Sequence, residues 1–354
     1  MNKIALGRSL IQKLRVLFIF AHLVPASAAD SPTSVSDQGS SNNLSSYLGL
    51  SNLGNTCFAN ASHKLLWKLP EVSQFLYNRD KLTGGPVELA EKLQLNPSVH
   101  ALLSSLNRGY TAHSTGSPPT HWQGFENRSQ RIFDDLDRVS LANNPKKSIS
   151  VRLKGVIGQD QVDASEYLHE LLNALDYKAY FGGVDFVSNK GQSTGIPETT
   201  FRVLFTGSQP TTIQEIVNSY LAENRIYLAL TRKTPPSHLI IDLVRLDLET
   251  GLKNRTPVTL DSLNLKFYKK RHSPEKRNPK AVQMYPVAII CHIGGVGFGH
   301  YIAYTYQPGP DGSGEGSWLL HDDNTVYRLT ESEMESAKSE WETSSEVILY
   351  QSED

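Results

Sequence analysis

The sequence is poor in cysteine: among its 354 residues only Cys57 and Cys291 carry a thiol. Two cysteines allow a single disulfide, and they are too few to build a four-cysteine zinc site. We predict neither a metal nor a cofactor for this chain.

An excess of charge of one sign is also lacking, because 35 lysines and arginines stand against 36 aspartates and glutamates. Without a basic excess the chain offers no obvious surface for phosphate backbones, and we do not expect nucleic acid as a partner. With 39% hydrophobic and 20% charged residues, the composition is that of an ordinary globular protein with room for one large core or two smaller ones.

Long hydrophobic runs are scarce, and the run at residues 16–24 is too short to span a bilayer, which takes about 20 residues. Basic residues precede this run and Ala26, Ser27 and Ala28 follow it, which is the order of a secretory signal peptide. We predict a signal over residues 1–29 and a disordered linker, rich in Ser, Asn, Asp and Gln, over residues 30–46. An uncleaved N-terminus at a membrane interface is the alternative.

One of the two cysteines stands in a setting that suits chemistry. A turn rich in glycine and asparagine, residues 49–56, delivers Cys57 to the start of an amphipathic helix, whose apolar residues recur at steps of three and four. A sulfur at a helix N-terminus lies beside unpaired N–H groups and the positive end of the helix dipole, which favours thiolate over thiol. The alternative for a lone cysteine is a buried structural thiol.

Asn52 lies five residues before Cys57, where its amide could donate to the oxyanion of a tetrahedral intermediate, and Gly54 allows a close approach. Residues 49–58 resemble the cysteine box of the ubiquitin-specific proteases, Gly-Leu-x-Asn-Leu-Gly-Asn-Thr-Cys-Phe/Tyr, with every fixed position present. The resemblance continues to Tyr350. It implies an α+β, papain-like cysteine protease with a helical thumb lobe and an antiparallel β palm lobe.

The resemblance also implies a catalytic domain over residues 47–351, with a thumb over 47–178, fingers over 179–235 and a palm over 236–351. Many members of the family bind zinc in the fingers with two Cys-x-x-Cys pairs, which this chain cannot supply. We therefore expect reduced fingers without zinc. Patterning predicts helices at 86–106, 130–139 and 212–221, strands at 200–205, 236–246 and 345–350, and an exposed basic loop at 266–280.

Residues 161–172 predict a second helix, with leucines on one face and acidic residues on another. Taken alone, Asp163-x-x-Glu166 is the start of a capped helix. The segment is nevertheless similar to the family's second box, Gln-Gln-Asp-Ala-x-Glu-Phe-Leu, with Val162 and Tyr167 as departures. That resemblance implies that Asp163 and Glu166 face the ubiquitin tail, which carries arginines and a backbone to be hydrogen-bonded.

An apolar strand at 284–293 precedes a glycine-rich loop at 294–299, after which His300 opens a returning strand. Two histidines compete for the role of general base: His300 lies beside the open end of the loop, whereas His292 lies at the end of a buried strand and is expected to pack in the core. The stretch resembles the family's histidine box, His-x-Gly-x-x-x-x-Gly-His-Tyr, which makes His300 the base. The same resemblance implies that the loop closes over the tail, next to Gly299 and Tyr301, and that Cys291 is a core thiol.

An imidazole that acts as a base needs an acceptor for its other ring N–H, which fixes the tautomer and stabilises the imidazolium. Asp322, four residues after Trp318, corresponds to the third member of the family's triad, and Asp323 to the acidic neighbour that supports the oxyanion site. His321 stands where the family usually has Phe. With Cys57 as the nucleophile, we expect both thiols to be free, because a disulfide would consume it.

We interpret the chain as a deubiquitinase that cuts the bond after the C-terminal glycine of ubiquitin, with Cys57, His300 and Asp322 as its triad and Asn52 and Asp323 at the oxyanion site. Its expected partners are ubiquitin or a ubiquitin-like protein and their conjugates, and we expect a monomer without a stable membrane span. A protease for another ubiquitin-like modifier, a catalytically silent ubiquitin-binding protein and a transglutaminase are the alternatives. The signal peptide suggests a bacterial protein that is exported and acts inside a eukaryotic host.

Overall fold

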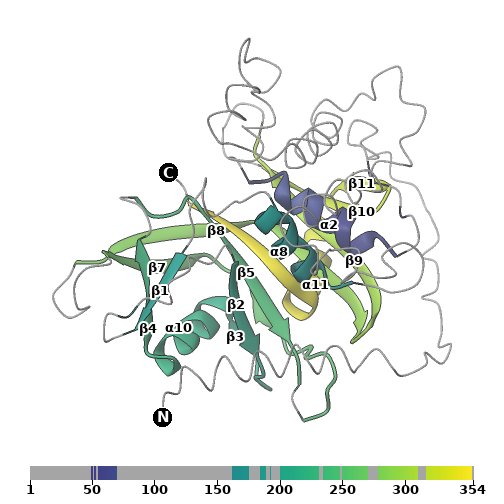
Figure 1. Ribbon diagram of the computed structural model, residues 1–354. Coiled ribbons are helices and arrows are strands. Elements are labelled where there is room, and N and C mark those ends of the chain that lie inside the picture. The colour runs from purple at the N-terminus through teal and green to yellow at the C-terminus, as the bar shows by residue number, and fades with distance from the viewer. Residues whose placement is uncertain are drawn as a thin grey trace. The chain divides into compact units, whose positions relative to one another are not determined.

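The computed structural model describes residues 49–50, 52, 55–69, 162–174, 184–188, 192, 200–230, 234–247, 249–269, 278–309 and 316–352 (Figure 1). All of these lie in one compact unit, Leu44–Asp354. The predicted signal, the linker and the helices at 86–106 and 130–139 fall outside the described residues and stay predictions. Among the helices that are described, none has the length and apolar character needed to cross a membrane.

Ten strands form one sheet in the described part of the chain. They are β1 (Val184–Ser188), β2 (Thr200–Phe205), β4 (Ile226–Leu230), β5 (His238–Arg245), β7 (Leu263–Lys269), β8 (Lys280–Gly295), β9 (Phe298–Gln307), β10 (Ser317–Asp322), β11 (Thr325–Arg328) and β12 (Ser345–Ser352). Two short strands, β3 (Thr211–Thr212) and β6 (Val258–Thr259), pair separately. The predicted strands at 200–205, 236–246 and 345–350 are confirmed, whereas part of the predicted basic loop, residues 266–269, belongs to β7.

The long strand β8 connects the parts of the sheet. Its first residues pair with β7, its last residues pair with β9, and β12 runs along its other edge. The chain then passes through the antiparallel pairs β9–β10 and β10–β11. The strands after residue 236 in the large sheet thus pair antiparallel with one another, and its parallel pairs, β2–β5 and β4–β7, each include a strand that comes before residue 236.

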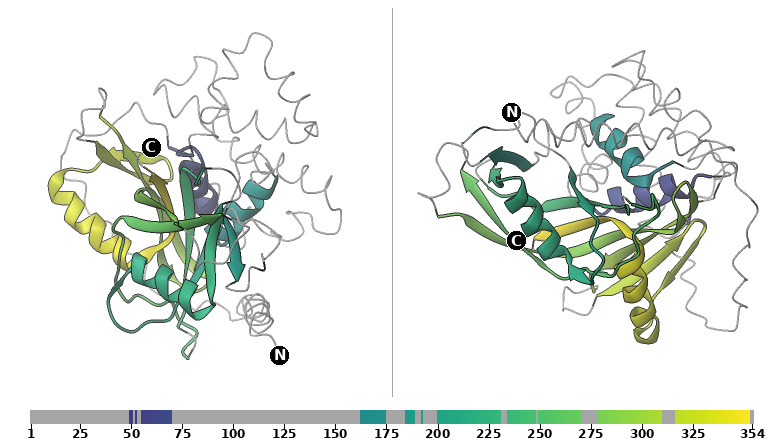
Figure 2. Two further views of the ribbon diagram at one scale, coloured as in Figure 1. Left: turned by 90° about the vertical axis from the view of Figure 1, so that its left-hand side faces the viewer. Right: turned by 90° about the horizontal axis from the view of Figure 1, so that it is seen from below.

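Four helices are described: α2 (Cys57–Leu66), α8 (Ala164–Ala174), α10 (Ile213–Glu223) and α11 (Glu331–Ser344). Alternate residues of β8 and β9 enter two separate cores. Ala288, Ile290 and Ala303 pack with α2 and α8, whereas Ile289 and Ile302 pack with α10 and α11. The central strands are therefore apolar on both faces, which explains their unbroken hydrophobic runs. Figure 2 shows α2 and α8 on one side of these strands and α11 on the other.

Candidate active site

Cys57 is the first residue of α2, forms no disulfide and is 3% exposed. The segment before it is held in place by Asn52, whose Oδ1 accepts a hydrogen bond from the backbone N–H of Thr56 at 3.1 Å. Because the helix has no acidic residue in its first turn, nothing there offsets the positive end of its dipole. The local setting predicted for a reactive thiol is therefore present.

His300 lies near the start of β9, opposite Ile293 in the β8–β9 hairpin. Two glycines, Gly294 and Gly299, face each other across the hairpin and have φ values of +146° and +147°. A Cβ on Gly299 would lie 2.4 Å from the carbonyl oxygen of Ile293 and 2.5 Å from Nε2 of His292. Only glycine fits at position 299 without a shift of the strand. The close approach of the two strands there sets the backbone position of His300.

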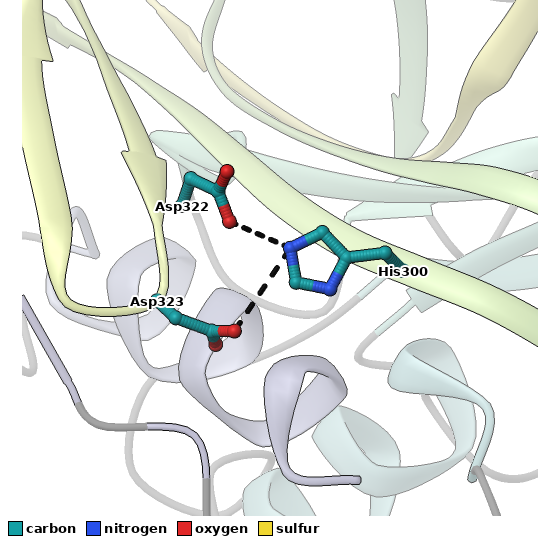
Figure 3. Close-up of side chains that lie close together, drawn as sticks. All are labelled: His300, Asp322 and Asp323. Atoms are coloured by element: carbon teal, nitrogen blue, oxygen red, sulfur yellow. Dashed lines mark hydrogen bonds and ion pairs between the residues drawn. The ribbon is translucent and has the colours of Figure 1, made fainter. Parts of the chain in front are cut away.

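Asp322 ends β10 and meets His300 across the β9–β10 pair. Its Oδ1 lies 2.6 Å from His300 Nε2, and Figure 3 shows this nitrogen between the carboxylates of Asp322 and Asp323. The hydrogen bond to Asp322, and after it a hydrogen bond to Cys57, raise the pKa of His300 to about 10 although burial opposes the shift. The imidazole thus bridges the sulfur and the carboxylate.

Asp323 occupies the tight turn between β10 and β11 with φ of 47°, a left-handed conformation that aspartate tolerates better than most residues. Its Oδ2 accepts from Asn52 Nδ2 at 2.8 Å and its Oδ1 accepts from Asn60 Nδ2 at 2.8 Å. Its backbone carbonyl accepts from the N–H of Leu50 at 2.7 Å. The turn is therefore tied to the segment that leads into Cys57.

His300, Asp322 and Asp323 offer three potential metal-ligand atoms within 4.8 Å of one another. Their hydrogen bonds do not suit a metal. A histidine with a pKa of about 10 is protonated at neutral pH, and a protonated ring nitrogen has no lone pair for a cation. Both oxygens of Asp323 already accept from amides. The donors and acceptors are arranged for proton transfer.

The residues predicted to line the tail site come from two elements, α8 and β9, and Tyr301 of β9 lies against the start of α8. Asp163 caps α8, since its Oδ1 accepts from the N–H of Glu166 at 2.9 Å, and Glu166 is exposed. Burial, together with the charges of Glu346 and Asp242, raises the pKa of Asp163 to about 7. Tyr301 is buried between the sheet and α8, and its neighbour Gly299 sits in the hairpin.

The sequence reasoning missed a buried polar cluster under the hairpin. Glu346 Oε1 lies 2.7 Å from Lys253 Nζ and 3.3 Å from His292 Nδ1, and Lys253 also donates to the carbonyl of His292 at 2.6 Å. The ring of His292 stacks on Tyr301 with centroids 4.4 Å apart. The prediction that His292 and Cys291 pack in the core is confirmed, because they are 6% and 0% exposed.

Asn60 was also missed: it is a buried polar residue three positions after Cys57, and its amide donates to the carboxylate of Asp323. His321, which stands where the family usually has Phe, is buried with its Nε2 2.8 Å from Thr305 Oγ1.

Comparison with known proteins places this site in a family. A search of curated protein sequences found no significant match. Among solved structures, the SAGA DUB module of Ubp8, Sgf11, Sus1 and Sgf73 bound to monoubiquitin matches with a TM-score of 0.59 and 14% identity, over 98% of this chain and 76% of the matched chain. The same module bound to ubiquitin aldehyde matches with a TM-score of 0.57 and 16% identity, over 89% and 71%. A yeast SAGA module with an Sgf73 mutant matches with a TM-score of 0.56 and 14% identity, over 91% and 72%.

At these identities the structural matches show the shared fold, which is the α+β fold that the sequence predicted. The sequence itself matches the ubiquitin carboxyl-terminal hydrolase family over residues 48–350, which is most of the chain. The protein therefore belongs to the ubiquitin carboxyl-terminal hydrolase family and is a cysteine-type deubiquitinating peptidase.

Proposed function

We propose that this chain hydrolyses the isopeptide or peptide bond after the C-terminal glycine of ubiquitin, with Cys57 as nucleophile, His300 as general acid and base, and Asp322 as the group that orients His300. The observation that carries the proposal is the position of the His300 imidazole, which contacts Cys57 on one side and Asp322, at 2.6 Å, on the other. A nucleophile, a base and a group that orients the base form the recurring arrangement for nucleophilic acyl transfer.

The protonation state of His300 supports this assignment. With a pKa of about 10, His300 holds a proton at neutral pH and hydrogen-bonds with Cys57. Thiolate is the nucleophilic form of cysteine, and we propose that Cys57 attacks in that form. Attack on the glycine carbonyl gives a tetrahedral oxyanion, and His300 gives its proton to the departing lysine amine as the C–N bond breaks. A water then attacks the thioester, His300 takes one proton from that water, and the Cys57 thiolate leaves with the bond pair of the C–S bond.

Asn52 is the proposed oxyanion donor. One of its two Nδ2 hydrogens is given to Asp323, and the second has no partner among the residues that the structure describes, so it can serve the developing negative charge. Asp163, Glu166, Gly299 and Tyr301 are proposed to hold the tail of ubiquitin. The solved relatives, described as bound to monoubiquitin and to ubiquitin aldehyde, support ubiquitin as the substrate.

A ubiquitin that carries a C-terminal electrophile tests this function. The native chain is expected to form a covalent adduct, and Cys57→Ala is expected to bind the probe without one. A native chain that only binds would indicate a silent ubiquitin-binding protein, and modification of glutamines in place of tail cleavage would indicate a transglutaminase. A matched panel of ubiquitin-like fusions and defined di-ubiquitins separates a ubiquitin protease from a protease for another modifier.

We further propose that residues 1–29 export the protein from a bacterial producer and that it acts as a monomer on conjugates inside a eukaryotic host. The basic, apolar and small-residue order of that segment supports export. Fusing residues 1–29 to a periplasmic reporter tests it, with Phe18→Asp as the control that breaks the apolar run. A reporter that stays in the cytoplasm would contradict export, and light scattering of the purified chain tests the monomer.

A further inference from the structure

Asn60 lies almost one helical turn after Cys57 in α2 and is 3% exposed. Its Nδ2 donates two hydrogen bonds, to the carbonyl of Leu50 at 3.0 Å and to Oδ1 of Asp323 at 2.8 Å. One buried amide group therefore joins the helix that carries the nucleophile to the turn next to Asp322. A buried polar group with both N–H hydrogens used by specific acceptors has a defined orientation.

The carboxylate of Asp323 is held at both oxygens. Asn60 Nδ2 donates to Oδ1 and Asn52 Nδ2 donates to Oδ2, each at 2.8 Å. Asp323 is only 12% exposed in its side chain, so few water molecules can replace either partner. The charge of the carboxylate is consequently spread over two amide donors.

The orientation of the Asn52 amide follows from its hydrogen bonds with Asp323 and with Thr56. Its Oδ1 accepts from the backbone N–H of Thr56 at 3.1 Å, while its Nδ2 donates to Asp323. A flipped amide would set its hydrogens against the N–H of Thr56 and its oxygen against a carboxylate, so the flip is unfavourable on both sides. The second Nδ2 hydrogen therefore has one available direction.

We infer that Asn60 is a positioning residue for the oxyanion site: by holding Oδ1 of Asp323 it keeps Oδ2 in place for Asn52, and so aims the second N–H of Asn52. The inference rests on the proposed function, because it assigns Asn60 to the same oxyanion. Asp323 also has a cationic neighbour, since its Oδ2 lies 3.9 Å from Nε2 of His300. Without Asn60 the carboxylate can rotate toward that imidazole and leave the Asn52 amide unoriented.

A double-mutant cycle on the full chain tests this connection. Asn60→Ala is expected to lower kcat about 10- to 100-fold on ubiquitin with a fluorogenic C-terminal amide, the range of partners that orient a reacting group, with KM changed less than about threefold. Asp323→Gly removes the carboxylate and suits the left-handed backbone at φ of 47°. In the Asp323→Gly background, Asn60→Ala is expected to change kcat less than about threefold, because the group through which it acts is gone.

Ser62→Ala is the matched control. Ser62 is a buried polar residue of the same helix whose hydroxyl lies 2.7 Å from the carbonyl oxygen of Phe58 and 3.1 Å from that of Ala164, away from the Asp323 turn. It is expected to lower the melting temperature as Asn60→Ala does while changing kcat less than about threefold. Should Asn60→Ala fail to fold, Asn60→Ser takes its place, because serine keeps a buried hydroxyl but is too short to reach Asp323.

Alkylation of Cys57 by iodoacetamide supplies a readout without an oxyanion. Asn60→Ala is expected to leave its rate within about threefold of the native rate, because displacement at an alkyl carbon forms no tetrahedral intermediate. Equal losses in alkylation and in kcat would show that Asn60 acts on the thiol or the helix and would overturn the inference, as would an equal loss of kcat in both backgrounds. A native chain that is alkylated but does not cleave the ubiquitin substrate would refute the proposed function, whereas a native chain that cleaves it with a kcat that Asn60→Ala leaves unchanged would overturn only the inference about Asn60.

Discussion

His300 Nε2 lies 2.6 Å from Asp322 Oδ1 and 3.9 Å from Asp323 Oδ2. Of these two adjacent carboxylates, only that of Asp322 is hydrogen-bonded to the imidazole. The difference follows from hydrogen bonding. Asp323 is engaged by Asn52 and Asn60, whereas the side chain of Asp322 is 49% exposed and is free to face His300. Asp322 therefore orients His300, whereas Asp323 orients the amides of Asn52 and Asn60.

Asp322→Asn is expected to lower kcat by about 100- to 10,000-fold, because the imidazole loses the acceptor that fixes its tautomer. The hydrogen bond to Asp322 is the largest cause that raises the pKa of His300 to about 10. Its loss moves that pKa down, so the alkaline fall of kcat/KM moves to lower pH. The measurement is the pH profile of kcat/KM for the ubiquitin substrate, with exposed Glu331→Gln as the control. An alkaline limb that does not move would contradict the assignment.

Asn52→Ala is expected to lower kcat about 100- to 1,000-fold, which is the usual effect of removing one oxyanion donor. The rate of Cys57 alkylation should stay near the native value, because that reaction forms no oxyanion. Steady-state kinetics beside alkylation kinetics separate the two effects. If alkylation slowed as much as turnover, Asn52 would be acting on the Cys57 segment through its contact with Thr56.

Gly299→Ala is expected to reduce kcat/KM at least about tenfold, because the new Cβ would lie 2.4 Å from the carbonyl oxygen of Ile293 and so displace the strand that carries His300. Gly297→Ala is the matched control: it lies in the same loop with φ of +81°, but nothing lies within 4 Å of its added Cβ. The Gly297→Ala variant should be destabilised only by the backbone strain of an alanine at positive φ, about 1 kcal/mol. Kinetics and thermal unfolding of both variants check this, and equal losses of activity would mean that backbone strain, not the close approach, is responsible.

Short-range patterns predicted much of this molecule. Cys57 does begin a helix, the strand at 200–205 has the predicted bounds, and His300 does meet Asp322. These predictions succeeded because the patterns are local or were tied to motifs at fixed spacing. Residues 266–269 of β7 were predicted to belong to a basic loop because lysines are typical of exposed loops. The alternation of Leu263, Leu265 and Phe267, which are all buried, instead marks a strand.

Other features could not be predicted because they depend on distant parts of the chain. Glu346, Lys253 and His292 come from separate segments and meet only when β8 and β12 pair. Helix α11 was missed because it is mostly polar, although its capping box, Thr330 with Glu333, was a readable start signal. The parallel pairing of β2 with β5 likewise has no local signature.

Glu346 is expected to make folding sensitive to acid. Burial alone would raise its pKa, but the contacts with His292 and Lys253 outweigh burial and lower it from 4.5 to about 2. A carboxyl group whose pKa falls on folding stabilises the folded state above its unfolded pKa and loses that contribution as pH falls through the folded value. The native chain should therefore lose about 3 kcal/mol of unfolding free energy from this group between pH 4.5 and about 2.

Urea denaturation across that pH range measures the effect against Glu346→Gln. The variant is expected to be less stable at neutral pH, because Lys253 stays buried without its anion, but flatter in its dependence on acid. Glu335→Gln, on the exposed side of α11, is the control and should keep the native slope. If Glu346→Gln and the native chain lost stability in parallel below pH 4.5, the folded carboxyl group would have an ordinary pKa, and Lys253 and His292 would not be holding it as an anion under the hairpin that carries His300.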